Sequence, residues 1–309
     1  MFVIAITNQK GGVAKTTTAV NLAAGLALLE YELNPKKPAK VLFVQLDSQG
    51  DGTAIITNVM NRGKPEDYDG TGLTIADILL ADQPPTTGDA IRHANIPLML
   101  VNKGVYSLDY IPVNPETMAE ASISIHNVDM RDQRLDLALQ DGIVMSKYKY
   151  VIVDTPPGNI LMIKNGLAAA THVIIPVATA GAGLRNLLDT FATVRKIQKL
   201  LNPDLKVLGI LPSKCIMSRS ETKLVLEELE KHYSELLFSP IIERAEISAA
   251  FTMGYDIFSY LPPRSGSPTF ISKKEAAIEF GRFTKEVYCR LHGIRLSNLE
   301  KSLNVEETA

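Results

Sequence analysis

Short apolar runs alternate with longer segments of helical spacing along this chain. The runs are rich in β-branched residues and end at polar or turn residues, which is typical of buried strands. These expected strands span residues 2–7, 41–47, 97–102, 108–112, 150–154, 172–177, 207–211 and about 256–260.

The longer segments place apolar residues three or four positions apart, as an amphipathic helix does. In the segment 15–33 the residues on one side are Ala19, Leu22, Ala23, Leu26 and Leu29. Further helices are expected at 74–81, 130–146, 162–170, 182–201, 219–234 and 273–292. Residues 57–72 and 82–96 are rich in Gly, Pro, Asp and Thr, and are expected to form surface loops.

Strands and helices alternate as far as residue 292. This order predicts the α/β class, with a doubly wound, mostly parallel sheet covered by helices on both faces. We therefore expect one domain over residues 1–292. The tail 293–309 is polar and acidic, and is expected to fray.

Composition narrows the function classes only slightly. Of the 309 residues, 46% are hydrophobic and 21% charged, which fits a globular protein with a sizeable core. The net charge of −2 excludes a uniformly basic nucleic-acid coat but not a local basic face. Cys215 and Cys289 form no disulfide or zinc pattern, so a reducing cytoplasm is expected. No signal peptide and no apolar run of the ~18 residues that a membrane span needs is recognised.

The stretch NQKGGVAKTTT, residues 8–18, joins the first strand to the first helix. Glycines let the backbone curl so that several N–H groups point inward, and the helix N-terminus adds free donors. Lys15 is then expected to reach the β- and γ-phosphates of a nucleotide and Thr16 to hold Mg²⁺. Gln9 and Ala14 replace the usual outer glycines, and Ala14 still donates its N–H if it is helical. The alternative is a glycine turn before an alanine-rich helix.

Two aspartates, Asp47 and Asp154, each close an apolar strand. Ligands of open α/β sheets bind at the carboxyl ends of the strands, and a hard cation prefers such oxygen ligands. The alternative for either residue is the capping of a turn. Together with the glycine-rich loop, the pair favours a metal-dependent phosphate site.

Three segments resemble motifs of the ParA/MinD family of ATPases. KGGVAKTT (10–17) is similar to its deviant Walker A motif, VLFVQLDSQGD (41–51) to its A′ motif, and YVIVDTPPG (150–158) to its Walker B strand. The resemblance implies a P-loop NTPase fold of the deviant Walker type, with ATP and Mg²⁺ as cofactors. The ATP-binding residues it implies are Lys10, Gly11, Gly12, Val13, Ala14, Lys15, Thr16 and Thr17. The adenine is expected between the loops at about 212–219 and 241–246.

The resemblance also implies catalytic roles for Lys10, Lys15 and Asp47, and metal-binding roles for Thr16, Asp47 and Asp154. Lys10 would cross a dimer interface to the partner's ATP, and Asp47 would orient the attacking water. Three residues depart from the family motifs, namely Gln45, Ser48 and Glu243. Gln45 stands where the family has the first aspartate of the A′ motif, so magnesium binding or turnover is expected to differ there.

Within the family, the chain is most similar to ParA-type partition ATPases without an N-terminal helix-turn-helix domain, because the loop begins at residue 8. The resemblance implies an ATP-dependent homodimer that binds nonspecific DNA and is released when a ParB-like or cargo-adaptor protein stimulates hydrolysis. Its function would be to segregate plasmid or chromosomal DNA, in the cytoplasm and on the nucleoid. Arg219, Lys223 and Arg244 are the candidate DNA contacts.

Other readings stay open at this point. A ParA-fold positioner of a protein cargo such as carboxysomes would share the same chemistry. A MinD-like ATPase would need a basic amphipathic tail, but this chain ends in VEETA, so no membrane partner is expected. A nucleotide-gated binding module with little turnover is the third alternative, and Gln45 is the feature that suggests it.

Overall fold

A seven-stranded sheet forms the centre of the protein in the computed structural model, which describes residues 1–57, 72–81, 87–97, 105–260 and 275–306. The strands are β1 Phe2–Ile6, β2 Lys40–Gln45, β3 Arg92–Pro97, β4 Val105–Tyr110, β5 Tyr148–Asp154, β6 His172–Ala178 and β7 Lys206–Ser213. Their order in the sheet is β3-β4-β2-β5-β1-β6-β7. Only β3 runs antiparallel to its neighbour among these described strands, so the sheet is mostly parallel, as predicted.

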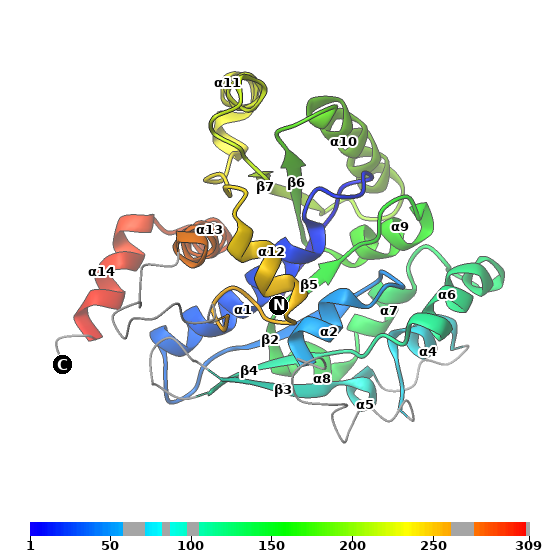
Figure 1. The fold of residues 1–309 in the computed structure, drawn as a ribbon. Coiled ribbons are helices and arrows are strands. Elements are labelled where there is room, and N and C mark those ends of the chain that lie inside the picture. Colours follow the sequence, from blue (N-terminus) through cyan, green and yellow to red (C-terminus); the bar gives the residue numbers. More distant parts are fainter. Residues whose placement is uncertain (58–71, 82–86, 98–104, 261–274, 307–309) are drawn as a thin grey trace.

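Helices cover both faces of this sheet (Figure 1). They are α1 Lys15–Leu33, α2 Asp51–Thr57, α4 Ile75–Leu80, α5 Thr87–Ala90, α6 Pro115–Ser124, α7 Arg134–Leu139, α8 Gly142–Lys147, α9 Ile160–Ala169, α10 Gly183–Leu200, α11 Ser220–Tyr233, α12 Ala245–Thr252, α13 Glu275–His292 and α14 Leu296–Glu306. Single 3₁₀ turns lie at Ile125–Asn127 and Ser234–Leu236.

Side chains on the two faces of the sheet form two separate hydrophobic cores, because successive side chains of a strand point to opposite sides. Val3 and Ala5 of β1 pack with α4, α6, α7, α9 and α10. Ile4 and Ile6 pack with α1, α2, α12 and α13. This arrangement confirms the predicted doubly wound architecture and brings the ends of β1, β2 and β5 to one edge.

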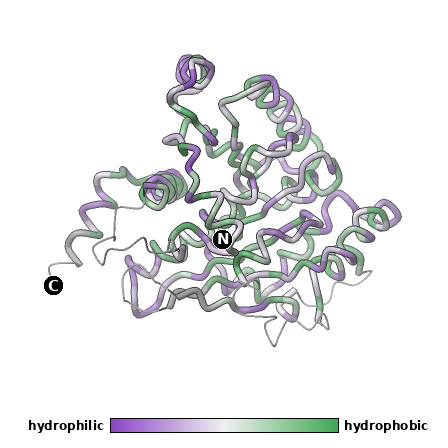
Figure 2. Tube along the Cα trace, in the orientation of Figure 1, coloured by the Kyte–Doolittle hydropathy of each residue, from purple (hydrophilic) through white to green (hydrophobic). Residues whose placement is uncertain are grey.

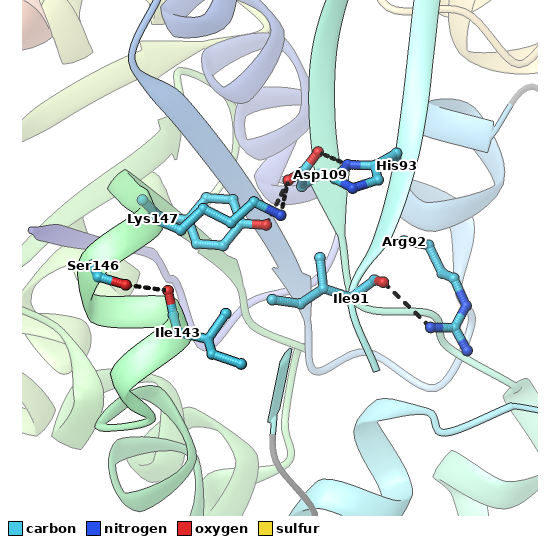
Figure 3. A network of polar contacts seen from close by, with 8 residues as sticks. Ile91, Arg92, His93, Asp109, Ile143, Ser146 and Lys147 are labelled. Carbon is cyan, nitrogen blue, oxygen red and sulfur yellow. Dashed lines mark hydrogen bonds and ion pairs between the residues drawn. The ribbon is translucent and has the colours of Figure 1, made fainter. Parts of the chain in front are cut away.

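A buried carboxylate fastens the antiparallel edge of the sheet (Figure 3). Asp109 of β4 is 1% exposed and is contacted by His93 of β3, by the Tyr148 hydroxyl, and by Lys147 Nζ at 3.2 Å. Burial and Asp109 both raise the pKa of Tyr148, so the phenol stays protonated as a donor. The cluster ties β3 and α8 to the interior of the sheet.

Several sequence predictions are corrected here. Residues 130–146 form two short helices, α7 and α8, because the Asp141 carboxylate accepts a hydrogen bond from Ile143 N at 2.7 Å and starts a new helix. Residues 256–260 form a turn instead of a strand, since Asp256 accepts bonds from the N–H groups of Phe258 and Ser259. The expected loop 82–96 contains α5 and most of β3.

Five predicted segments lie partly outside the described residues. These are the strand 97–102, of which the structure describes only the first residue, the loops 57–72 and 82–96, of which it omits 58–71 and 82–86, the helix 273–292, of which it omits 273–274, and the tail 293–309, of which it omits 307–309. Helices α2, α6 and α12 had no counterpart in the prediction.

The tail is also corrected, because residues 296–306 form helix α14 instead of fraying. Leu299 is 2% exposed and packs with Leu29 of α1 and Cys289 of α13. Leu296 and Leu303, three and four positions away, complete the apolar face of α14. The acidic end of the chain therefore follows a packed helix.

We predict that Leu299→Ala lowers the free energy of unfolding by about 2 kcal/mol, because it removes buried methyl groups from this small cluster. Urea denaturation followed by circular dichroism measures the change. The exposed neighbour Glu300 provides the control, since Glu300→Ala is expected to change stability by less than about 0.5 kcal/mol. Equal stability of both variants would contradict the docking of α14.

Candidate nucleotide and metal site

The loop between β1 and α1 curls through two residues with positive φ. Gly12 has φ 75° and Ala14, the residue before α1, has φ 64° and ψ 33°. The condition that Ala14 is helical is therefore not met, because this is the left-handed region, which costs a residue with a β-carbon about 1–2 kcal/mol. The Ala14 carbonyl accepts from Thr18 N at 2.9 Å, so the first turn of α1 helps to hold this conformation.

Side chains and backbone from neighbouring elements hold the loop from two sides. Asn8 is buried, donates to Pro176 O at 2.8 Å, and accepts from Lys10 N at 3.0 Å. The Ser213 hydroxyl donates to Val13 O at 3.0 Å. The loop is thus fixed by the ends of β6 and β7, as a preorganised phosphate cradle requires.

Lys15 lies over the inside of this loop. Its side chain is buried and its Nζ donates to Lys10 O at 2.8 Å. Burial lowers the pKa of Lys15, while the nearby carboxylates Asp154 and Asp47 oppose that shift. An ammonium group held inside a loop of backbone N–H groups is placed to bind phosphate oxygens.

Asp154 ends the central strand β5 and is completely buried. Its Oδ2 accepts from Gln45 Nε2 at 3.2 Å, and its Oδ1 finds no hydrogen-bond partner within the described part of the chain. Burial raises the pKa of Asp154 to about 7, with Asp47 adding to the shift and Thr16, Lys15 and Gln45 opposing it. Because Thr16 affects this pKa, its side chain lies close to the Asp154 carboxylate. Its hydroxyl does not form a hydrogen bond to Oδ1.

These groups fit Mg²⁺ chemically. The unpartnered Oδ1 of Asp154, the Thr16 hydroxyl and the half-buried Asp47 supply oxygens, the ligand type that Mg²⁺ prefers. Across the described ranges, no three His, Cys, Asp or Glu residues form a metal-binding group. A site with few protein ligands suits a cation that keeps water and phosphate oxygens in its shell.

A pocket of about 260 Å³ opens beside the start of α1. It is lined by Ala14, Thr17, Thr18, Ser213, Lys214, Ile241, Ile242, Glu243, Arg244, Ile247, Ser248, Phe251, Thr252 and Phe280. The segments 212–219 and 241–246, expected around adenine, both contribute to it. The sequence prediction missed α12 and Phe280, although Ile247 and Phe251 stand four residues apart, which is the spacing of one helix face.

Lys10 projects to the other side of the loop. It is exposed and lines a second pocket of about 280 Å³ together with Gly11, Gly12 and Arg219. A β-carbon at Gly181 would lie 4.0 Å from Lys10 Nζ, so the ammonium group sits near the segment before α10. The structure brings Lys15, Thr16, Asp47 and Asp154 together, and it leaves Lys10 outside that group.

The candidate DNA residues divide into two groups. Arg219 precedes α11 and Lys223 lies in its first turn, and both are exposed. Arg244 lines the first pocket and forms ion pairs with Glu275 and with Glu279, the latter at 2.8 Å. Its charge is therefore largely neutralised by α13.

The surface around Arg219 and Lys223 is acidic as well as basic. Helix α11 is mostly hydrophilic along its length (Figure 2). Its exposed acidic residues are Glu221, Glu227, Glu228 and Glu230. Glu221 Oε1 accepts from Gly181 N at 2.7 Å, so part of this acidic surface is committed to an internal contact.

The fold and the site together define a P-loop NTPase. The buried strand β1 leads into a glycine-rich loop and then a helix. On one side of β1 lie β5 and β2, and the aspartates Asp154 and Asp47 stand at or just after the carboxyl ends of these two strands. Comparison with known proteins refines this class. The family model described as an AAA domain matches residues 1–207.

Two relatives cover most of this chain. Sporulation initiation inhibitor protein Soj of Bacillus subtilis is 33% identical over 280 residues, which are 89% of this chain and 98% of Soj. Chromosome partitioning protein ParA of Myxococcus xanthus is 31% identical over 271 residues, which are 87% of this chain and 85% of that protein.

A solved structure is also similar over most of its length. Cobyrinic acid a,c-diamide synthase from Mycobacterium smegmatis, with a bound ATP analogue and magnesium, has a TM-score of 0.65 and 26% identity. The match covers 94% of this chain and 96% of that one. The chain belongs to the ParA/MinD family of ATPases, and the relatives it matches include a ParA-type partition protein.

The pKa of Asp154 generates a prediction for the metal-free protein. A carboxyl group whose pKa is about 7 when folded and near 4 when unfolded binds protons more tightly in the folded state. Stability therefore falls as pH rises from about 4 to 7. Asp154→Asn removes this penalty. At pH 8 the free energy of unfolding of the variant is therefore expected to exceed that of the parent protein by a few kcal/mol, on the order of the pKa shift of Asp154.

Urea unfolding in EDTA at pH 5 and pH 8 measures this difference, and the gap between the two proteins is expected to shrink at pH 5. Asp204→Asn, at an exposed position, is the matched control and should follow the parent protein. A gap that is the same at both pH values would show that the Asp154 carboxyl does not titrate in this window.

Proposed function

We propose that this protein is a Mg²⁺-dependent ATPase that dimerises on ATP, binds DNA nonspecifically and is released when a partner protein stimulates hydrolysis. The observation that carries the proposal is the convergence of Lys15, Thr16, Asp47 and Asp154 beside a pocket with apolar walls. The name of one relative, chromosome partitioning protein ParA of Myxococcus xanthus, supports a role in DNA segregation.

The phosphate loop would bind ATP through its backbone N–H groups, from Lys10 to Thr17, and through Lys15. Thr16 and Asp154 would hold Mg²⁺, which neutralises charge on the β- and γ-phosphates when bound. The residues Ile247, Phe251 and Phe280 would enclose the adenine in the first pocket. The bound ATP analogue and magnesium of the similar synthase structure support this assignment of cofactors.

Hydrolysis would depend on Asp47 and on a second copy of the chain. Asp47 lies at the open edge of the site and would orient the attacking water. Lys10 is directed away from its own loop interior, which suits a role on the ATP of a partner copy. A positive charge added to the transferring phosphoryl group in this way stabilises the transition state.

The cargo would be a plasmid or a chromosome, with a ParB-like or cargo-adaptor protein as the stimulating partner. The protein would then act in the cytoplasm and on the nucleoid. Within the described residues, no helix combines the length and apolar character needed to cross a membrane. Arg219 and Lys223 remain the candidate DNA contacts, whereas the ion pairs of Arg244 make it a weaker one.

Substitutions at Lys15 and Asp47 separate binding from hydrolysis. We predict that Lys15→Ala lowers ATP affinity by about 100-fold or more, because a charge-assisted contact to phosphate is lost. Asp47→Ala is expected to keep ATP affinity and to accumulate an ATP-bound dimer, because Thr16 and Asp154 would still hold Mg²⁺ while the group that orients the attacking water is lost. Isothermal titration, phosphate release and light scattering after gel filtration measure these effects.

The exposed Lys36 gives the control, since Lys36→Ala should behave as the parent protein does. Normal hydrolysis by Asp47→Ala would exclude Asp47 from the mechanism.

DNA binding is the test of the segregation role. We predict binding with ATP but not with ADP or without nucleotide, and a steep loss of affinity as salt increases. Arg219→Ala should weaken binding, whereas Lys231→Ala, at the far end of α11, serves as the matched control. Fluorescence anisotropy with a random-sequence duplex measures both. No binding in any nucleotide state would refute the DNA role and favour a protein-cargo positioner.

A further inference from the structure

Gln45 is a buried amide at the centre of the candidate site. It is 1% exposed and lies at the end of β2, directly beside Asp154 in the register of the sheet. Its Nε2 donates to Asp154 Oδ2 at 3.2 Å. Its Oε1 accepts from the backbone N–H of Thr53 at 3.0 Å and from the Thr53 hydroxyl at 3.3 Å. Gln45 thus connects the carboxylate of β5 to the first turn of α2.

The chemistry of the partners fixes the orientation of this amide. A flipped amide would place its oxygen against the Asp154 carboxylate and its NH₂ group against the Thr53 N–H. Both of those contacts are repulsive, so only the observed orientation satisfies all partners. An amide is also the side chain that offers a donor on one side and an acceptor on the other.

An aspartate at position 45, which the resembling motif has, could not make the same connection. Its side chain is one methylene shorter, and its two oxygens can only accept when ionised. It would face the carboxylate of Asp154 with a like charge. In this chain the neutral amide of Gln45 therefore forms a hydrogen bond with the Asp154 carboxylate, where an aspartate would repel it.

The connection closes the loop that carries Asp47. This loop runs from Leu46 to Gly50, and the bond between Gln45 and Thr53 spans its base. A β-carbon at Gly52 would lie 2.7 Å from Phe43 Cζ and 3.2 Å from Gln45 Nε2, so α2 packs directly on β2. Any movement of α2 away from Gln45 would move Asp47 relative to Asp154.

We propose that Gln45 is a positioning residue that fixes the Asp154 carboxylate and helix α2 relative to each other, and thereby places Asp47. The catalytic part of this inference rests on the proposed ATPase function. It leaves Asp154 Oδ1 as the oxygen directed to the metal site, because Oδ2 is occupied by the amide. Gln45 would act through the two residues that it contacts, Asp154 and Thr53.

The main test uses Gln45→Met, which keeps the length of the side chain and removes both polar groups. In the nucleotide-free protein, hydrogen exchange of the peptide 51–57 is expected to become about tenfold faster or more, because the Thr53 N–H loses its acceptor. The kcat for ATP hydrolysis should fall about tenfold or more, while KM for ATP stays within about twofold, because Lys15 and the adenine pocket are untouched.

Gln198→Met is the matched control. Gln198 is likewise a glutamine whose amide donates a hydrogen bond, to the backbone carbonyl of Leu205 at 2.7 Å, but it lies on helix α10, away from the candidate site. It should change neither the exchange of 51–57 nor kcat. Faster exchange with unchanged kcat in Gln45→Met would overturn the proposal, because Gln45 would then be only structural. Unchanged exchange would overturn it as well.

Gln45→Glu decides the question if the methionine variant does not fold. It keeps an acceptor for Thr53 but replaces the amide donor to Asp154 with a carboxyl group that competes with Asp154 for the negative charge, so exchange of 51–57 should match the parent protein while kcat falls about tenfold or more. A parent-like kcat would overturn the proposal. Failure of the ATPase function is distinguishable, because the parent protein itself would then release no phosphate, whereas the exchange comparison needs no nucleotide.

Discussion

The site depends on one carboxylate, Asp154, that is buried although burial disfavours its ionised form. Asp154 ends the central strand of the sheet, is completely buried, and has one oxygen without a hydrogen bond in the described part of the protein. Its pKa of about 7 expresses the free energy that burial costs. The neighbouring strands and the helices on both faces hold the group in place, and a cation would satisfy the free oxygen. The same packing that makes the sheet stable therefore makes Asp154 a candidate ligand for a metal ion.

The loops around Asp154 are held by their neighbours, and not by their own sequence alone. Ala14 keeps a left-handed backbone that alanine disfavours, between a loop bonded to the end of β7 and the first turn of α1. The Asp47 loop is closed at its base by Gln45 and Thr53. The contact of Ser213 with Val13 joins residues 200 positions apart, and the contact of Gln45 with Thr53 joins a strand to a helix, so the geometry of the site depends on packing between elements.

Features that depend on strong local sequence patterns were mostly predicted, whereas features that depend on contacts between elements were not. The central strands and the long helices α1, α10, α11 and α13 carry strong periodic patterns, and their predicted positions agree with the structure within a few residues. The turn at 256–260 and the division of 130–146 were missed because aspartates accept local backbone bonds within otherwise apolar segments. Helix α6 was missed although Asn114 and Pro115 form a recognisable start signal. The docking of α14 and the lining by Phe280 require tertiary contacts that a local pattern does not contain.

The surface charges constrain how such a protein could bind DNA. The chain has a net charge of −2, the exposed face of α11 is rich in glutamate, and Arg244 is already paired with carboxylates. Nonspecific affinity grows with the number of phosphates neutralised, so a single copy with Arg219 and Lys223 offers few contacts. Two copies joined by ATP would double those contacts and make the second set effectively intramolecular. Weak basicity of the monomer would then be an advantage, because under the proposed function DNA binding would depend on the bound nucleotide and would end when the dimer separates.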